Sequence, residues 1–479
     1  SCSLSEPWDL SAIEARRRLG EGTRSPVELW TSCLSRIKAC NETVNAVVTL
    51  YEEAVLAAAK RAEQAVSRGE PLGLLHGLPA GVKDLNETAG LRTTFGSELY
   101  ADYVPAEDEL LAARLRGAGA VIAAKTNTPE FGAGANTWNR VFGATGNPYD
   151  PALTCGGSSG GSAVALACGM MPLASGSDLG GSLRTPAGYC GVYGLRPTPR
   201  LVPDDAPGRV FNPLSVDGPM ARSVEDIHLM LRAMACHDPR DPWSLPGAQT
   251  LVGDSLAPTD PRSLKVAFSA DLGFAPVSRE VRSLFAKRME ALAPLFGSLE
   301  PADPPLAESE RVFQALRGVG FVAAHLERLR KAPEKVGPNV TANVELGLGL
   351  SAEEIARAEA DWGLLYRRFL AFRAGYDLLI APVAAVQPFP KTQNAPEEID
   401  GLTLDNYVSW LGLSFGITLT IHPSLAFPCG RDEKGVPFGI QLIGTRFGDK
   451  QLLEMALGLE KELEGDLSLG RPSPFLGAT

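Results

Sequence analysis

The sequence predicts an α/β fold with a mixed, largely parallel central sheet that helices cover on both faces. The first observation is the order of elements from residue 78 to 124, where two apolar runs (78–82 and 121–124) flank a helical segment, Asp108 to Gly117. Strand, helix and strand in this order are typical of parallel pairing, because a parallel connection must cross over the sheet. The second observation is that short apolar runs, separated by Gly, Pro, Asn and Asp, recur further along the chain.

The N-terminal part, about residues 1–70, is predicted to be helical. Ser25 to Glu28 reads Ser-Pro-Val-Glu, a capping box with proline at the first helical position, and apolar residues follow at helical spacing as far as Ile37. A second amphipathic helix is predicted from Glu52 to Ser67, with alanine and valine on one face and charged residues on the other. Both helices are expected to serve packing.

The predicted catalytic core, about residues 72–235, contains two runs rich in glycine and serine, Gly156 to Ser162 and Gly180 to Ser182. The apolar segment from Ala163 to Leu173 lies between them and is predicted to form a buried helix, since it is too short to span a membrane. A strand is expected at Leu173 to Ser175, and Ser223 is expected to cap a helix that reaches Ala235. Because glycine permits positive φ and close approach, such runs can point several N–H groups at one spot.

The C-terminal part, about residues 264–479, is predicted to set specificity, and the long segment before it, His237 to Ser263, is predicted to be a loop. Strands, helices and a hairpin are expected at Leu264–Ser269, Ser278–Leu295, Ala352–Arg373, Leu378–Val383 and Ser424–Ile443. We expect the loops of residues 300–430 to shape the substrate pocket. The three parts are predicted to form a single domain over residues 1–479.

The composition excludes several classes of partner. The net charge is −11, which argues against a nucleic-acid backbone or an anionic membrane as a partner, because both need clustered Lys and Arg. The start of the chain shows no signal peptide and no segment has the roughly 18 apolar residues of a membrane span, so we expect a cytoplasmic protein. The eight cysteines form no zinc-type spacing, and neither a metal nor a cofactor is expected. Cys155 borders the first glycine run, where a structural role is favoured over a catalytic thiol.

Lys83 is the first candidate for chemistry, because it ends an apolar strand rather than standing on a polar surface. Burial disfavours the ammonium form and lowers the pKa of a lysine, which is what a base near neutral pH requires. The alternative is a structural salt bridge, for example with Asp84. For a lone lysine that alternative would be preferred.

Lys83 is not alone, since Ser158 and Ser182 follow it in the two Gly/Ser runs. With these runs the chain resembles the amidase signature family, whose members hydrolyse carboxylic amides with a Ser-Ser-Lys triad. The resemblance implies the fold of that family. It is carried by several ordered motifs, which makes it more specific than one glycine run: Leu78-Pro79, Lys125 to Phe131, Phe142 to Pro148, both Gly/Ser runs, Gly194 to Thr198 and, more weakly, Gly435 to Gln441.

The resemblance assigns the three catalytic roles residue by residue. Lys83 matches the base, Ser158 the bridging serine and Ser182 the nucleophile that forms the acyl-enzyme. Neutral Lys83 would accept the proton of Ser158 while Ser158 takes that of Ser182, so no histidine is needed. In the family the peptide bond before the bridging serine, here Gly157 to Ser158, is cis.

The same resemblance implies an oxyanion hole made by backbone N–H groups at Leu179, Gly180 and Gly181, together with Ser182. Asp178 is expected either to brace this loop by accepting N–H bonds or to be a plain turn residue. For Arg184 a structural ion pair is favoured over a contact with a substrate carboxylate.

The substrate pocket is less well marked in the sequence. Gly132 matches a position that lines the acyl pocket, and with Ser158 it is the predicted substrate-binding residue. Phe131, Trp138 and Trp410 could supply apolar walls, although buried aromatic residues usually belong to the core. His422 stands where a small residue is expected, a departure that would bear on specificity.

Three readings of the function remain open. The favoured one is a stand-alone amidase acting on a small-molecule amide, with a homodimer left open. The second is the glutaminase (A-type) subunit of a tRNA-dependent amidotransferase. The third is a histidine-dependent serine esterase, because residues 156–160 also satisfy G-x-S-x-G; it would make Ser158 the nucleophile and needs a histidine, with His228, His237, His325 and His422 as candidates. A further match, S-x-x-K at residues 35–38, is attributed to surface packing of a helix.

Overall fold

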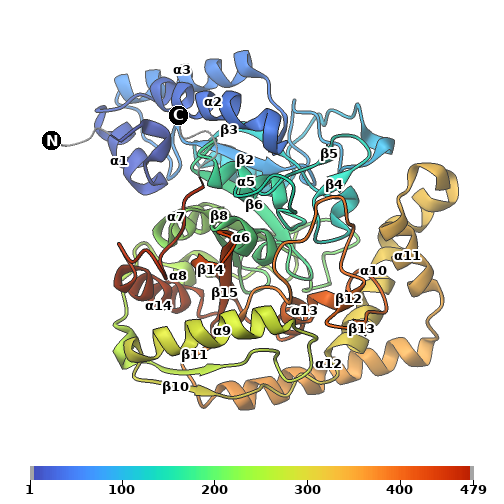
Figure 1. Ribbon diagram of the computed structural model, residues 1–479. Coiled ribbons are helices and arrows are strands. Elements are labelled where there is room, and N and C mark those ends of the chain that lie inside the picture. The colour runs from blue at the N-terminus through green and yellow to red at the C-terminus, as the bar shows by residue number, and fades with distance from the viewer. Residues whose placement is uncertain (1–4, 475–479) are drawn as a thin grey trace.

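An eleven-stranded mixed sheet runs through the molecule (Figure 1), a computed structural model in which residues 5–474 are described. In spatial order its strands are β1 (Val47–Thr49), β3 (Val121–Thr126), β2 (Pro79–Lys83), β6 (Leu173–Asp178), β8 (Val216–Ala221), β7 (Tyr193–Arg196), β14 (Ser424–Arg431), β15 (Pro437–Ile443), β11 (Leu378–Pro382), β9 (Lys265–Phe268) and β10 (Ser298–Pro301). Two small ribbons, β4 (Trp138–Asn139) with β5 (Gly143–Ala144) and β12 (Glu398–Ile399) with β13 (Leu402–Thr403), lie outside this sheet.

The prediction of a mixed α/β sheet is confirmed, but parallel pairs do not predominate in the described part. They join β3, β2 and β6 near one edge and β11, β9 and β10 at the other. The pairs between these groups are antiparallel, as is β1 with β3. The short turn between β14 and β15 explains part of this, since a hairpin connection can join only antiparallel strands.

Helices cover the sheet on both sides (Figure 1). In chain order they are α1 (Ala12–Glu21), α2 (Pro26–Val44), α3 (Glu52–Ser67), α4 (Leu110–Gly117), α5 (Gly160–Ala167), α6 (Arg184–Cys190), α7 (Val224–Met234), α8 (Ala248–Val252), α9 (Arg279–Leu292), α10 (Ser309–Lys331), α11 (Pro338–Leu348), α12 (Ala352–Arg373), α13 (Gly412–Leu419) and α14 (Asp449–Glu462). Figure 1 shows α1, α2 and α3 near the β3 edge, whereas α9 and α12 lie at the opposite end with β10 and β11. None of the helices in residues 5–474 is long and apolar enough to cross a membrane.

Several elements begin where their capping residues predict. Helices α3 and α12 have the predicted bounds, and the side chains of Ser25 and Ser223 accept hydrogen bonds at the starts of α2 and α7. The S-x-x-K match lies on α2, where Lys38 is exposed and pairs with Glu52 at 3.2 Å, so its attribution to a surface helix is confirmed.

Two predicted elements need correction. The apolar segment from Ala163 to Leu173 is not one helix, because α5 ends at Ala167, Gly169 turns the chain at φ +75°, and Leu173 already opens β6. The segment from 237 to 263 is not all loop, since it contains α8.

Helix α5 is the buried element that positions the first Gly/Ser run. All of its residues are buried, and it contacts β2, β3, β6 and β8. This approach requires glycine: a Cβ on Gly161 would lie 2.1 Å from the backbone nitrogen of Asn127. The helix therefore starts against the sheet, and the two serines before it are held beside the end of β2.

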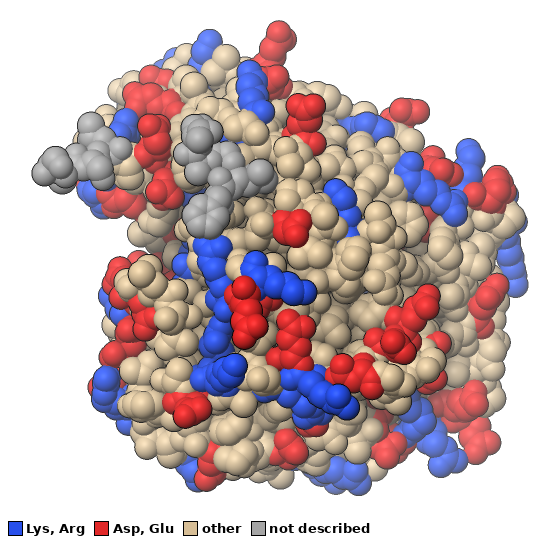
Figure 2. Space-filling view, viewed as in Figure 1, with Lys and Arg blue, Asp and Glu red and all other residues tan. Residues whose placement is uncertain are grey.

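Charged residues are spread over the surface rather than gathered by sign. On the face shown in Figure 2, basic and acidic side chains lie next to one another in several places, and much of the face between them is uncharged. Many of the ion pairs are local, such as Arg17 with Glu21 at 2.8 Å.

Candidate active site

Lys83 is the last residue of β2 and is completely buried. Its Nζ lies 2.6 Å from Ser158 Oγ, 2.8 Å from Ser177 Oγ and 3.0 Å from Ser159 Oγ. Burial lowers the pKa of Lys83 to about 7, although the charges of Asp217 and Asp178 act to raise it. Its hydrogen-bond partners are thus three neutral hydroxyls.

The alternative of a salt bridge with Asp84 does not hold. The carboxylate of Asp84 accepts hydrogen bonds from the backbone and side chain of Thr94 instead, the first at 3.1 Å. A second buried lysine, Lys125, donates to the hydroxyls of Thr88 and Thr93 at 2.9 and 3.0 Å.

The first Gly/Ser run brings two serines to Lys83. The peptide bond between Gly157 and Ser158 is cis, as the resemblance implies. The N–H of Ser159 donates to the carbonyl of Ser182 at 3.2 Å, which ties the first run to the second. The sequence pointed to Ser158, but the contacts of Ser159 and Ser177 with Lys83 were not predicted, because they depend on how α5 and β6 meet.

Asp178 braces the loop that follows β6. Its carboxylate accepts N–H bonds from Gly181 at 3.0 Å and Leu183 at 3.1 Å, and it pairs with the buried guanidinium groups of Arg184 at 3.0 Å and Arg196 at 3.2 Å. Burial alone would raise the pKa of Asp178, but the two arginines outweigh it and hold that pKa well below its ordinary value. The bracing role is therefore observed, and Arg184 has the predicted structural ion pair.

The same contact changes the predicted oxyanion hole. The N–H of Gly181 is already bonded to Asp178, so it does not point freely into the site. The N–H groups of Leu179 and Gly180 have no hydrogen-bond partner within residues 5–474. Gly180 also lies against α10, since a Cβ there would be 3.1 Å from Phe313 Cζ.

Ser158 and Ser182 both line a cavity of about 420 Å³, within the usual range for small-molecule sites. In the described part of the chain no hydrogen bond joins the two hydroxyls. Gly132 also lines this cavity with φ +70°, and a Cβ there would lie 3.5 Å from Ser158 Oγ and 2.9 Å from Leu85 Cδ1. A Cβ at position 132 would thus clash with Leu85 and come into van der Waals contact with Ser158 Oγ.

The predicted aromatic walls are only partly present. Phe131 lines the cavity, but Trp138 bonds to Asn394 elsewhere and Trp410 packs in the core against Phe389. His422 does not line the cavity either; it is buried against Phe369, with ring centroids 4.8 Å apart. The expectation that His422 bears on specificity is therefore not supported by a contact between His422 and the cavity.

Two lining segments were not predicted. One face of α10 contributes residues from Leu316 to Arg328, and the segment from Gly208 to Asp217 contributes others. Residues 300–430 therefore do contribute to the pocket, as expected, but they do so through a helix and not through loops. A signal did exist in the sequence: arginine, phenylalanine and histidine recur at helical spacing from Arg317 to Arg328.

The histidine-dependent reading has no geometric support. Within residues 5–474 no histidine bonds to Ser158 or Ser182. His325 lines the cavity, but its ring lies between Phe131 and Phe321, with centroids 4.7 and 5.2 Å away. Burial and nearby arginines lower the pKa of His325 to about 3.

Cys155 is buried, and burial raises the pKa of its thiol to about 12, which leaves almost no thiolate at neutral pH. The structural role favoured for this cysteine therefore stands. Among the described residues, no group of three or more His, Cys, Asp or Glu side chains comes together as a metal-binding set.

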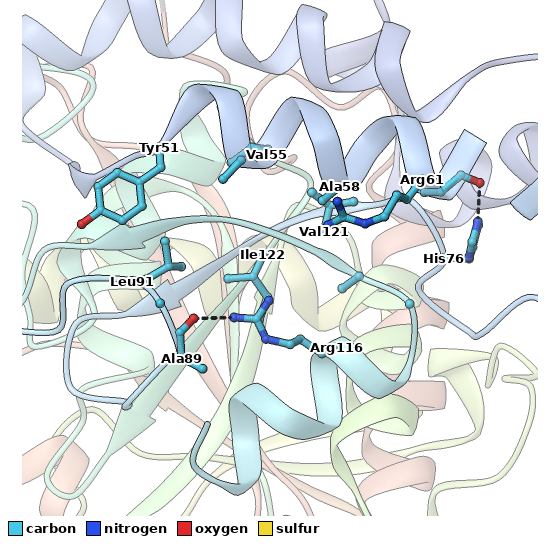
Figure 3. Close-up of a pocket in the computed structure, with 15 residues that line it drawn as sticks. Tyr51, Val55, Ala58, Arg61, His76, Ala89, Leu91, Arg116, Val121 and Ile122 are labelled. Carbon is cyan, nitrogen blue, oxygen red and sulfur yellow. Dashed lines mark hydrogen bonds between the residues drawn. The ribbon is translucent and has the colours of Figure 1, made fainter. Parts of the chain in front are cut away.

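A second cavity, of about 500 Å³, lies between α3, β3 and α4 (Figure 3). Its lining is mainly apolar, and two of its polar groups are engaged: Arg116 donates to the carbonyl of Ala89 at 3.0 Å, and His76 Nε2 lies 2.9 Å from the carbonyl of Ala62. None of the three candidate catalytic residues lines it, so volume alone does not locate the chemistry.

Comparison with known proteins gives a consistent result. A family model described as Amidase matches residues 28–453. The acylamidase of Rhodococcus erythropolis is 33% identical over 455 residues, covering 94% of this chain and 95% of that protein. The A-type subunit of the glutamyl-tRNA(Gln) amidotransferase of Alkaliphilus metalliredigens is 31% identical over 457 residues, covering 90% of this chain and 91% of that protein. The crystal structure of a bacterial aryl acylamidase of the amidase signature enzymes superposes with a TM-score of 0.86 at 26% identity, covering 94% of this chain and 96% of that one.

These likenesses extend well beyond the Gly/Ser runs. They include the long C-terminal part, in which the sequence motifs are weak, and the same eleven-stranded α/β arrangement. The chain is therefore an amidohydrolase of the amidase signature family.

Proposed function

We propose that this chain is a stand-alone amidase that cleaves a carboxylic amide through an acyl-enzyme on Ser182, with Ser158 as the bridge and Lys83 as the base. The observation that carries the proposal is the 2.6 Å contact between Lys83 Nζ and Ser158 Oγ in a fully buried setting. A lysine whose pKa is lowered to about 7 is substantially neutral at physiological pH and can accept a proton.

The proposed reaction begins with a proton relay. Neutral Lys83 takes the proton of Ser158 while Ser158 takes that of Ser182, and Ser182 Oγ attacks the amide carbonyl carbon. The C–N bond then breaks as the relay runs backwards and protonates the leaving amine. Water enters in place of the amine, gives its proton to the same relay and releases the carboxylic acid, which restores the free serine.

The backbone around Ser182 would stabilise the oxyanion of the tetrahedral intermediate. The N–H groups of Leu179 and Gly180 are free to donate, whereas Gly181 acts indirectly, since its bond to Asp178 holds the loop in shape. Loss of one donor of this kind costs on the order of 3 kcal/mol in the barrier. Gly132 would leave the space beside Ser158 for the substrate.

The test compares wild type with Ser182→Ala on a panel of small and medium amides followed by mass spectrometry. Wild type should release amine without other proteins added, and intact mass should show an acyl adduct on the wild type alone. The matched control is Ser215→Ala, which changes a serine that lines the same cavity but has no role in the relay. An adduct that persists in Ser182→Ala would place the nucleophile elsewhere.

A second candidate function is the glutaminase component of a tRNA-dependent amidotransferase, which several relatives named as such support at 31–34% identity over at least 90% of this chain. The two functions differ in what the purified chain can do alone. Turnover of simple amides by the chain alone favours the amidase. Activity confined to glutamine and dependent on added partner proteins favours the amidotransferase component.

A further inference from the structure

The inner face of α10 places positive charge over the active-site cavity. Arg317 and Arg328 both line the cavity from this helix, and Arg209 lines it from the segment before β8. Arg209 is neutralised by Asp204 at 3.0 Å. The lining contains one carboxylate, Asp217, so the two arginines of α10 are not matched by acids within the cavity.

Arg317 is the more deeply buried of the two, with only 7% of its surface exposed. Its Nη2 donates to the hydroxyl of Tyr407 at 2.9 Å, and its guanidinium stacks on Phe321 at 4.4 Å from the ring centroid. Its Nε has no partner, and in residues 5–474 no carboxylate lies within 4.0 Å of the group. A buried cation without an acid is costly, which is why buried charges are normally paired.

Two titratable groups, His325 and Asp217, line the cavity together with Arg317. His325, two turns further along α10, has its pKa lowered to about 3 by burial and then by Arg328 and Arg317. Asp217 has its pKa raised to about 7 by burial and by Asp204 and Glu109, so it carries only part of a negative charge at neutral pH. The cavity therefore favours an anionic group on its ligand.

The position of Arg317 relates that charge to the reacting centre. Phe313, one helical turn earlier on the same face, is the residue that touches Gly180 of the proposed oxyanion loop. Arg317 thus lies about 5–6 Å further along the helix. A substrate whose carbonyl sits at Ser182 could reach Arg317 with an anion a few bonds away.

We propose that the substrate is an amide that carries a carboxylate and that Arg317 binds this carboxylate. The proposal rests on the proposed amidase function and specifies its substrate class. A carboxylate suits the site because a guanidinium binds it through two parallel N–H bonds, and Arg317, whose buried Nε has no partner in residues 5–474, has only the neutral hydroxyl of Tyr407 on its Nη2. The carboxylate can be on the acyl side or the amine side of the scissile bond.

The experiment uses two matched pairs of substrates. Glutaramate and pentanamide differ by a carboxylate on the acyl side, and N-butanoylglycine and N-propylbutanamide differ on the amine side. Wild type should prefer the anionic member of one pair by at least about tenfold in kcat/KM, and the pair identifies the side. Rising salt should weaken this preference, because it screens the charge.

The variants Arg317→Gln and Arg317→Lys test the residue. The first should raise KM for the preferred anionic substrate by about tenfold or more while the neutral partner stays within about twofold, and the second should restore part of the preference. Arg311→Gln is the matched control, because Arg311 lies on the same helix but is exposed and pairs with Glu308 at 2.8 Å. Circular dichroism of each variant establishes that it is folded.

The outcomes separate this inference from the proposed function. If wild type hydrolyses neutral and anionic amides equally, or if Arg317→Gln lowers both alike, the carboxylate proposal is overturned while the amidase proposal stands. If wild type hydrolyses none of the four and forms no adduct on Ser182, the amidase proposal itself fails. Binding of glutaramate and N-butanoylglycine to Ser182→Ala, measured by calorimetry, should also weaken when Arg317 is replaced.

Discussion

At the scale of single residues, the environment of Lys83 sets the pH range of the proposed relay. Within residues 5–474 no carboxylate forms an ion pair with Lys83, and burial is the largest cause of its low pKa of about 7. As pH falls through this value the amine becomes protonated and can no longer accept a proton from Ser158. As pH rises above it the base is fully available.

We therefore expect kcat/KM to rise through about pH 7 and then level off, with the acid limb set by Lys83. Lys83→Met should lose at least about 10²-fold in rate and should not show this limb. The measurement is a pH profile of single amides for wild type and variant. A wild-type rate that is flat from pH 5 to pH 9, or a variant with unchanged activity, would rule out a lysine base.

Asp178 is the residue on which the shape of the proposed oxyanion loop depends. It neutralises two buried arginines and also accepts two N–H bonds from the loop. Removing one partner of a buried ion pair is much more costly than removing an exposed pair, because the remaining charge stays buried.

Asp178→Asn should therefore lower the free energy of unfolding by about 3–5 kcal/mol, as measured by urea denaturation. The control is Asp254→Asn, since the Asp254 side chain is 98% exposed and 3.6 Å from Arg232, and it should change stability by less than about 1 kcal/mol. A similar small effect for both variants would contradict the bracing role. Because the pKa of Asp178 is held well below its ordinary value, its stabilising contribution is lost only as pH falls below the ordinary carboxylate range.

At the scale of elements, the position of α5 decides how closely Ser158, the proposed bridging serine, approaches Lys83. Its first turn is glycine because backbone lies in the way: a Cβ on Gly161 would meet Asn127 N at 2.1 Å. By contrast, a Cβ on Gly363 of α12 would meet nothing within 4 Å. Glycine is therefore required by close packing at position 161, whereas packing does not require it at position 363.

Gly161→Ala should destabilise the protein by about 1–3 kcal/mol or more through overpacking and should also lower activity, because α5 carries Ser158 at its start. Gly363→Ala should stabilise it by about 0.5–1 kcal/mol, since alanine loses less backbone entropy in a helix. Thermal or urea unfolding of the two variants beside wild type measures both effects. If both variants changed the stability by the same amount and in the same direction, the close approach of backbone at Gly161 would not be the reason that glycine is required there.

Helix α10 forms one side of the cavity that Ser158 and Ser182 line. It contacts the oxyanion loop through Phe313 and provides the arginine to which we assign substrate binding. His325 and Arg328 of α10 both lie against the ring of Phe131, which links the helix to the segment that contains Gly132. Specificity in this protein is therefore proposed to reside in a helix from the second half of the chain.

At the scale of the whole molecule, the two halves of the chain are joined at the centre of the sheet. Strand β7 from the first half pairs with β14 from the second, and α6, which follows the nucleophile loop, packs on β14 and β15. Strand β14 is almost entirely buried. A break in the sequence pattern near residue 250 is thus not a boundary in the sheet.

We expect the fragment of residues 1–253 to lack a cooperative thermal transition when expressed alone, because the β7 edge and the faces of α6 and α7 would lose their cover. Co-expression with residues 254–479 should restore folding and amide hydrolysis. Calorimetry and activity assays measure the two properties. A fragment that unfolds cooperatively by itself would mean that the chain has two independent units.

Local features of the sequence determined much of the scaffold and part of the site. Caps at Ser25 and Ser223 predicted where helices start, because a hydroxyl that accepts an N–H bond acts within three residues. The position of Lys83 at the end of an apolar strand predicted its burial, since burial of a whole strand extends to its last residue. The Gly/Ser runs marked the loops that hold Ser158 and Ser182.

Tertiary structure alone decided the remainder, because those contacts join residues far apart in the chain. Nothing near Lys83 in sequence indicated that the hydroxyls of Ser159 and Ser177 would accept hydrogen bonds from its amine. The role proposed for Arg317 depends on the fold, which places α10 along the cavity and leaves the guanidinium without an ion-pair partner in residues 5–474. Local patterns fix helices, caps and turns, whereas the partners of a buried charge depend on which elements the fold brings together.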